Sequence, residues 1–155
     1  MKTIALRLQP NEDLKAALDA LARDHNLEAA CILTCVGSLS TAVLRFADQK
    51  EGTRLAGRFE IVSMTGMFSV HGSHYHISLS DGQGRTIGGH LLEGSRIYTT
   101  AELVIGVLPH VRFLREPDSV TGYDELAIYP LEATGDDAAV PAVVPASNPA
   151  KEVPM

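Results

Sequence analysis

Histidines are the residues of this sequence whose type and spacing could do chemistry. Four of the six, His71, His74, His76 and His90, lie between positions 71 and 90. In His74-Tyr75-His76, the alternation of strand side chains would place the two imidazoles on one face and Tyr75 on the other. Neutral imidazole is a common ligand of zinc and other divalent transition metals. The pair therefore predicts part of a metal site.

The third imidazole, that of His90, comes on the next expected strand, and the connection decides its face. An odd hairpin loop, such as 82–84 or 81–83, would place it on the face of the other two imidazoles. A bulge at Gly88-Gly89 would do the same after an even loop. Three imidazoles and an open position suit catalytic zinc. A surface or core role without metal is the alternative on spacing alone.

A metal site of this kind needs a carboxylate that fixes ring tautomers or moves a proton. Glu102 is the carboxylate that we expect in this role, and Glu93 is the second candidate. The other histidines have simpler interpretations. We expect His71 in a turn, His25 at a helix end and His110 in a loop.

The elements that would position these residues are mostly strands. Residues 12–25 carry apolar side chains at helical spacing after an N-cap at Asn11, which predicts one helix. Alternating or apolar runs predict strands at 2–8, 29–36, 41–47, 57–64, 74–80, 86–92, 98–108, 111–114 and 126–129. The expected fold class is α+β, with one main N-terminal helix packed on a largely antiparallel, curved β-sheet.

The C-terminal part differs in composition. Residues 134–155 hold four of the eight prolines and no aromatic residue, which predicts a flexible or extended tail after a domain at 1–133. Acidic residues at Asp118, Asp124 and Glu125 are expected in a solvated loop.

Charge and cysteine content limit the partners and the compartment. A net charge of −6, with no Lys/Arg run longer than two residues, argues against a surface that grips phosphate backbones. No apolar run is long enough for a membrane span. Cys31 and Cys35 would lie on one face of a strand, too far apart for a disulfide, as buried thiols of a reducing compartment. We therefore expect a cytoplasmic protein.

Several blocks follow one another along the middle of the chain: Gly57-Arg58-Phe59-Glu60-Ile61, Met64-Thr65-Gly66-Met67-Phe68, His74-Tyr75-His76-Ile77-Ser78-Leu79, Asp81-Gly82, Gly88-Gly89-His90-Leu91 and Tyr98-Thr99-Thr100-Ala101-Glu102-Leu103-Val104-Ile105. As an ordered set they resemble the plant and prokaryote conserved (PPC) domain family, over about residues 3–131. The resemblance implies a homotrimer and a partner-binding role for Gly57–Ile61. Stand-alone prokaryotic relatives are assigned to DNA binding by association. The sequence contains no Arg-Gly-Arg-Pro AT-hook, so direct DNA binding is not expected here.

The fold also resembles that of acetolactate decarboxylase, which holds zinc through three histidines that include a His-X-His pair. This likeness implies zinc at His74, His76 and His90. Two functions stay open. One is a trimeric regulatory module that acts through protein or nucleic-acid partners, and the other is a zinc-dependent lyase or hydrolase on a small polar substrate, with Glu102 moving the proton. A metal that only stabilises the hairpin is a third possibility.

Overall fold

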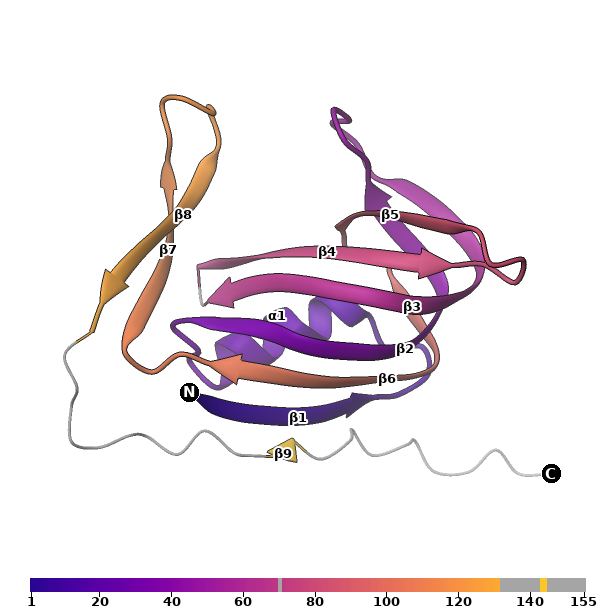
Figure 1. The fold of residues 1–155 in the computed structure, drawn as a ribbon, viewed down its shortest axis with the longest axis horizontal. Helices are drawn as coiled ribbons and strands as arrows, with labels where there is room; N and C mark the ends of the chain where they lie inside the picture. Colours follow the sequence, from indigo (N-terminus) through magenta and orange to yellow (C-terminus); the bar gives the residue numbers. More distant parts are fainter. Residues whose placement is uncertain (70, 132–142, 145–155) are drawn as a thin grey trace.

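Most of the chain is β-strand. A computed structural model describes residues 1–69, 71–131 and 143–144. Within these ranges there is one short helix, α1 (Leu14–Asp24) (Figure 1). The strands are β1 (Lys2–Leu8), β2 (Ala30–Arg45), β3 (Thr53–Ser69), β4 (Gly72–Ser80), β5 (Thr86–Leu91), β6 (Arg96–Val107), β7 (Val111–Pro117), β8 (Asp124–Pro130) and β9 (Val143–Val144).

The main sheet is curved and partly closed on itself. Its order is β3-β4-β5-β2-β6-β1-β9, and β3 also pairs with β2. Strands β2, β3, β4 and β5 therefore pair in a closed circuit. Every pairing is antiparallel except the short one between β1 and β9. Strands β7 and β8 form a separate hairpin that stands beside one end of the main sheet (Figure 1). The predicted mostly antiparallel α+β fold is confirmed.

The core lies between α1 and the inner face of the sheet. The helix buries Leu14, Leu18, Leu21 and Ala22, which share one face. From β4, Tyr75 is fully buried and its hydroxyl donates a hydrogen bond to Asp19 Oδ1 of the helix at 3.2 Å. The helix thus covers the face of β4 that carries Tyr75.

The helix is shorter than the predicted 12–25, because the residues before it pair with β6. Asn11 N donates to Ile97 O, and Ile97 N donates to Glu12 O, both at 3.0 Å. The N-cap is Asp13 and not Asn11. Its carboxylate accepts from Ala16 N at 3.1 Å and from Gly94 N at 2.6 Å. One side chain therefore caps the helix and fastens it to the turn before β6.

Strand β2 replaces the two strands predicted at 29–36 and 41–47. It continues through Gly37, where the register against β6 shifts. A Cβ there would lie 2.1 Å from Thr100 O, so glycine permits the close approach of the two strands. The two predicted strands are therefore one strand with register irregularities inside it.

A further shift in β2, between Ile32 and Thr34, corrects the cysteine prediction. The shift exchanges the inward and outward positions of the residues that follow it. Cys35 is therefore buried, while Cys31 is half-buried on the opposite face. Both thiols are free, and burial raises the pKa of Cys35 to about 12. The expectation that both lie buried on one face is wrong.

At the C-terminal end, Asp124 and Glu125 begin strand β8 and do not lie in the loop where they were expected. Asp118 does lie in the preceding turn and accepts from Val120 N and Thr121 N. The tail predicted at 134–155 falls outside the described residues except for β9. In the described ranges, no helix combines the length and apolar character needed to cross a membrane.

Candidate metal centre

The hairpin between β4 and β5 sets the face of His90. Asp81 N donates to Arg85 O at 3.0 Å, and the Asp81 carboxylate accepts from Gln83 N and Arg85 N. These backbone donors hold the pKa of Asp81 below its usual value. Gly84 has a φ of 79°, which favours glycine. The loop is therefore Gly82-Gln83-Gly84, one of the two odd loops that the sequence allowed.

The register continues without a bulge from this loop to the histidines. His76 pairs directly with His90, and Gly88 and Gly89 lie inside the regular ladder. A Cβ on Gly88 would lie 2.8 Å from Ile77 O, and one on Gly89 would lie 2.9 Å from Arg45 O. The glycines therefore allow close approach of the neighbouring strands, and the alternative of a bulge at this point is wrong.

Three imidazoles converge on the outer face of the sheet. His74 and His76 come from β4 and His90 from β5, and one ring nitrogen of each lies within 4.8 Å of the others. The Nε2 atoms of His74 and His76 are 3.1 Å apart. His74 and His76 are exposed, while His90 is half-buried. The odd loop thus brings together the three residues that the sequence singled out.

The electrostatics of the cluster favour the neutral form of His74 and His90. Partial burial, with further lowering by His74 and Arg45, brings the pKa of His90 down to about 4. Partial burial also lowers the pKa of His74, with further lowering by His76 and Arg115. Metals bind the neutral form of imidazole, so at neutral pH these two rings need not lose a proton first.

One atom of the cluster has no partner of its own. His90 Nδ1 is buried and makes no hydrogen bond with the described residues. A buried ring nitrogen without a partner is costly unless a water molecule or an ion satisfies it. The donor set, three nitrogen ligands of the type that zinc prefers, fits a divalent transition metal.

Two grooves meet at His74. The first, which we call the Cys31 groove, has a volume of about 500 Å³ and is lined by Cys31, Met67, His74 and His76 among others. The second, the Arg45 groove, has a volume of about 710 Å³ and includes His74 and His90. Both grooves are also lined by two residues of the β7–β8 hairpin, Arg115 and Glu125.

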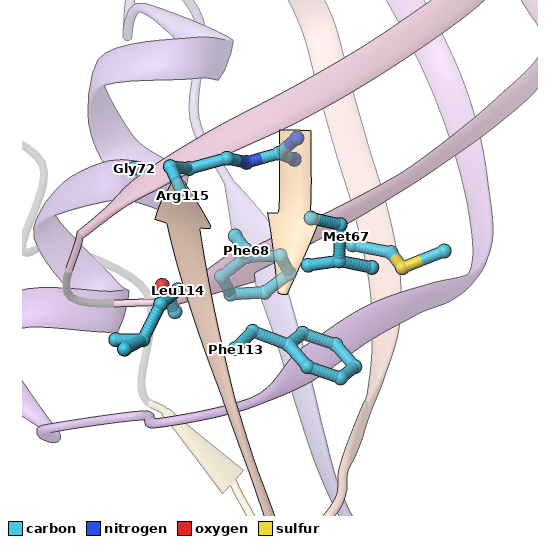
Figure 2. A pocket seen from close by; sticks show the side chains of 8 residues that line it. Met67, Phe68, Gly72, Phe113, Leu114 and Arg115 are labelled. Atoms are coloured by element: carbon cyan, nitrogen blue, oxygen red, sulfur yellow. The ribbon is translucent and has the colours of Figure 1, made fainter. Parts of the chain in front are cut away.

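A packed junction holds this hairpin beside the histidines. Figure 2 shows Phe113, Leu114 and Arg115 of β7 against Met67 and Phe68 of β3. The crevice between them is too narrow to admit a water molecule. Because Met67 is the register partner of His74, this contact places Arg115 at the cluster. The junction is thus a structural support and not a binding site.

Within a single chain, neither of the two predicted carboxylates lies at the histidine cluster. Glu102 is exposed on β6, where its register partners are Arg7 and Val36, and it lines neither groove. Glu93 is exposed beyond the end of β5 and lines neither groove. Glu125 lies there instead. No local pattern in the sequence indicates that the β7–β8 hairpin stands beside the histidines.

The block predicted to bind partners is part of β3. Arg58 and Glu60 are exposed, while Ile61 is buried and Phe59 packs against the core. The Arg58 guanidinium lies 4.7 Å from the centre of the Tyr98 ring on β6, at a distance typical of a cation–π contact. The strand predicted at 57–64 lies within β3, and the role of the block toward partners stays a prediction.

Comparison with known proteins identifies the family. The family model described as "Plants and Prokaryotes Conserved (PCC) domain", also abbreviated PPC, matches residues 1–109. The chain belongs to this family. A solved hypothetical protein from Salmonella cholerae-suis (Salmonella enterica) is 42% identical with a TM-score of 0.82, covering 83% of this chain and 94% of that one. The sequence resemblance to the PPC domain is therefore confirmed.

Two more distant PPC-fold neighbours carry functional names. The "Metal-containing Protein AF0104" from Archaeoglobus fulgidus is 25% identical, with a TM-score of 0.68 over 82% of this chain and 94% of that one. A "Putative DNA-binding protein" from Ralstonia eutropha JMP134 is 26% identical, with a TM-score of 0.69 over 79% of this chain and 89% of that one. These names describe the neighbours.

One curated relative is a much longer protein than this chain. "Bifunctional protein GlmU" of Synechococcus sp. (strain JA-2-3B'a(2-13)) is 47% identical over 131 residues, which are 84% of this chain and 21% of that protein. The chain thus spans about a fifth of the length of the curated relatives that it matches. The match shows that a closely similar domain occurs within a larger polypeptide.

Proposed function

We propose that this PPC domain is a metal-dependent module that binds a small polar ligand beside His74, His76 and His90. The observation that carries the proposal is the convergence of three imidazoles within 4.8 Å. Zinc is the first candidate for the ion, because three nitrogen ligands with an open position are typical of its reactive sites. The "Metal-containing Protein" among the neighbours, at 25% identity, supports the same proposal.

A ligand-binding role is favoured over a purely structural one. Structural zinc sites are closed by four protein ligands, whereas the group found among the described residues has three. His74 and His76 are exposed and line a groove of about 500 Å³. A bound divalent ion would supply Lewis acidity toward an oxygen of the ligand. Glu125 lines the same groove and could hold or accept a proton, the role that the sequence assigned to Glu102.

The proposed assembly is a homotrimer. Leu33, Val36 and Val62 are 46%, 54% and 58% exposed on strands of the main sheet. Such apolar side chains on a sheet face support contact with another copy or a partner. The Gly57–Ile61 block, with Arg58 stacked on Tyr98, is a second candidate contact surface. A regulatory module with a nucleic-acid partner is the second candidate function, supported by the name of the Ralstonia neighbour and opposed by the net charge of −6.

The test is elemental analysis of protein purified without chelator, followed by zinc titration of the metal-free form. We expect one equivalent of zinc per chain. His76→Ala should weaken zinc binding on the order of 100-fold or more, since it removes one of three ligands. His71→Ala is the matched control, because His71 lies nearby but outside the trio, and it should bind zinc like the wild type. A wild-type protein that takes up no zinc would contradict the proposal.

A further inference from the structure

Two arginines at the candidate metal centre have side chains without a hydrogen-bond or ion-pair partner among the described residues. Arg45 is the register partner of His90 at the end of β2, and Arg115 comes from β7. Both are half-buried and both line the Arg45 groove. Within residues 1–69, 71–131 and 143–144, neither guanidinium group takes part in a hydrogen bond or an ion pair, whereas those of Arg85 and Arg112 do.

A half-buried guanidinium without an acceptor among the described residues is a candidate group for binding an anion. Removing a charge from water is unfavourable unless an opposite charge and hydrogen bonds replace the lost solvation. The planar fork of arginine matches carboxylates and phosphates, which it binds through two parallel hydrogen bonds.

The groove is lined by three positive and three negative residues, which differ in burial. Its exposed charged residues are one positive, Lys50, and two negative, Asp48 and Asp124. Water strongly screens the charges of these exposed side chains. Its half-buried charges are Arg45 and Arg115 against Glu125. Among the half-buried residues there are thus two arginines and one glutamate. A divalent ion at the histidines would add two further positive charges beside them. With the metal bound, the inner part of the groove is therefore strongly positive.

We propose that the Arg45 groove binds a small oxyanion, in the first place an organic carboxylate, between Arg45 and Arg115 and next to the histidine cluster. This inference rests on the proposed function, because it names the ligand class of the same site. The groove volume of about 710 Å³ lies within the range of small-molecule sites. An anion held there would have its other polar groups beside His74 and His90.

The test is calorimetric titration of the zinc-loaded and the metal-free protein with succinate, inorganic phosphate and the neutral succinamide. We expect succinate to bind and succinamide not to bind. Arg115→Gln should weaken succinate binding about 10- to 100-fold, the effect of losing charge-assisted hydrogen bonds. Arg115→Lys, which keeps the charge without the fork, should lie between Arg115→Gln and the wild type. Arg45→Gln should act in the same direction as Arg115→Gln.

Arg23→Gln, at the end of α1, is the matched control and should bind succinate like the wild type. Arginine-dependent binding of phosphate in preference to succinate would support the oxyanion site and assign it to phosphate. If zinc binds but neither anion does, or if binding is unchanged in both arginine variants, this inference is overturned while the metal proposal stands. If zinc does not bind, the metal proposal fails, and the metal-free titrations still decide whether the arginines bind an anion.

Discussion

The two faces of strand β4 carry opposite kinds of residue within a few positions. On the inner face, Tyr75, Ile77 and Leu79 are at most 3% exposed and pack in the core. On the outer face, His74 and His76 are exposed and contact mainly one another and His90. Because strand side chains alternate, the inner face packs in the core and the outer face carries the candidate metal centre.

This division has an energetic consequence. Burial of the inner residues removes apolar surface from water, which is the main favourable term in folding. Clustering of imidazoles on the outer face gains little for folding, and His90 Nδ1 is buried there without a hydrogen-bond partner in the described part of the chain. Substitutions on the inner face should therefore lower stability and spare metal binding, and those on the outer face should do the reverse.

The largest effect on stability is expected from Leu79→Ala on the inner face. Leu79 is fully buried, so truncation should lower the free energy of unfolding by about 2–5 kcal/mol. Urea denaturation measures this loss. Zinc affinity, measured where the variant is still folded, should remain that of the wild type. Ile87→Ala on the facing strand removes a residue that is 37% exposed and should cost less. A large loss of zinc affinity in Leu79→Ala would break the separation of the two faces.

Gly66→Ala should affect both faces. A Cβ at Gly66 would lie 2.5 Å from His74 O and 2.5 Å from Tyr75 Cδ1, so the backbone of β4 has to move. We expect a loss of about 1–3 kcal/mol in the free energy of unfolding, together with weaker zinc binding. Gly82→Ala at the hairpin tip is the control, because a Cβ there meets nothing within 4 Å. Wild-type zinc affinity in Gly66→Ala would show that the position of His74 is not set by this contact.

The smallest effect concerns the pH dependence of the metal-free protein. Burial lowers the pKa of His90 in the folded state from 6.5 to about 4. Between these values the unfolded chain takes up a proton that folded His90 does not, so His90 destabilises the protein as the pH falls from 6.5 toward 4. Urea denaturation across this range should show a steeper loss for wild type than for His90→Gln. Equal slopes would contradict the account of His90.

Local patterns in the sequence were sufficient for the hairpin and its histidines. Alternation placed His74 and His76 on one face, and the parity of the loop allowed His90 to join them, as the register now shows. The α+β class followed in the same way from one amphipathic segment and many alternating ones. These features depend on neighbours in the chain.

Features that depend on distant residues could not be predicted. The helix start moved because Asn11 and Glu12 pair with Ile97, a residue of β6. The face of Cys31 depends on a register shift against β6. Arg115 and Glu125 reach the histidines because the β7–β8 hairpin packs against the end of β3, and no spacing in the sequence reports that contact. The prediction that Glu102 supplies the carboxylate of the site was likewise made without knowledge of contacts between distant strands, and no such contact among the described residues supports it.

The most direct test of the central claim is a crystal structure of the zinc-loaded protein, with anomalous data collected on both sides of the zinc absorption edge. The account predicts one zinc peak on the outer face of β4 and β5, with a ring nitrogen of His74, His76 and His90 each about 2.0–2.1 Å from the ion. No peak at the three imidazoles, or a peak held by other residues while the trio stays free, would contradict it.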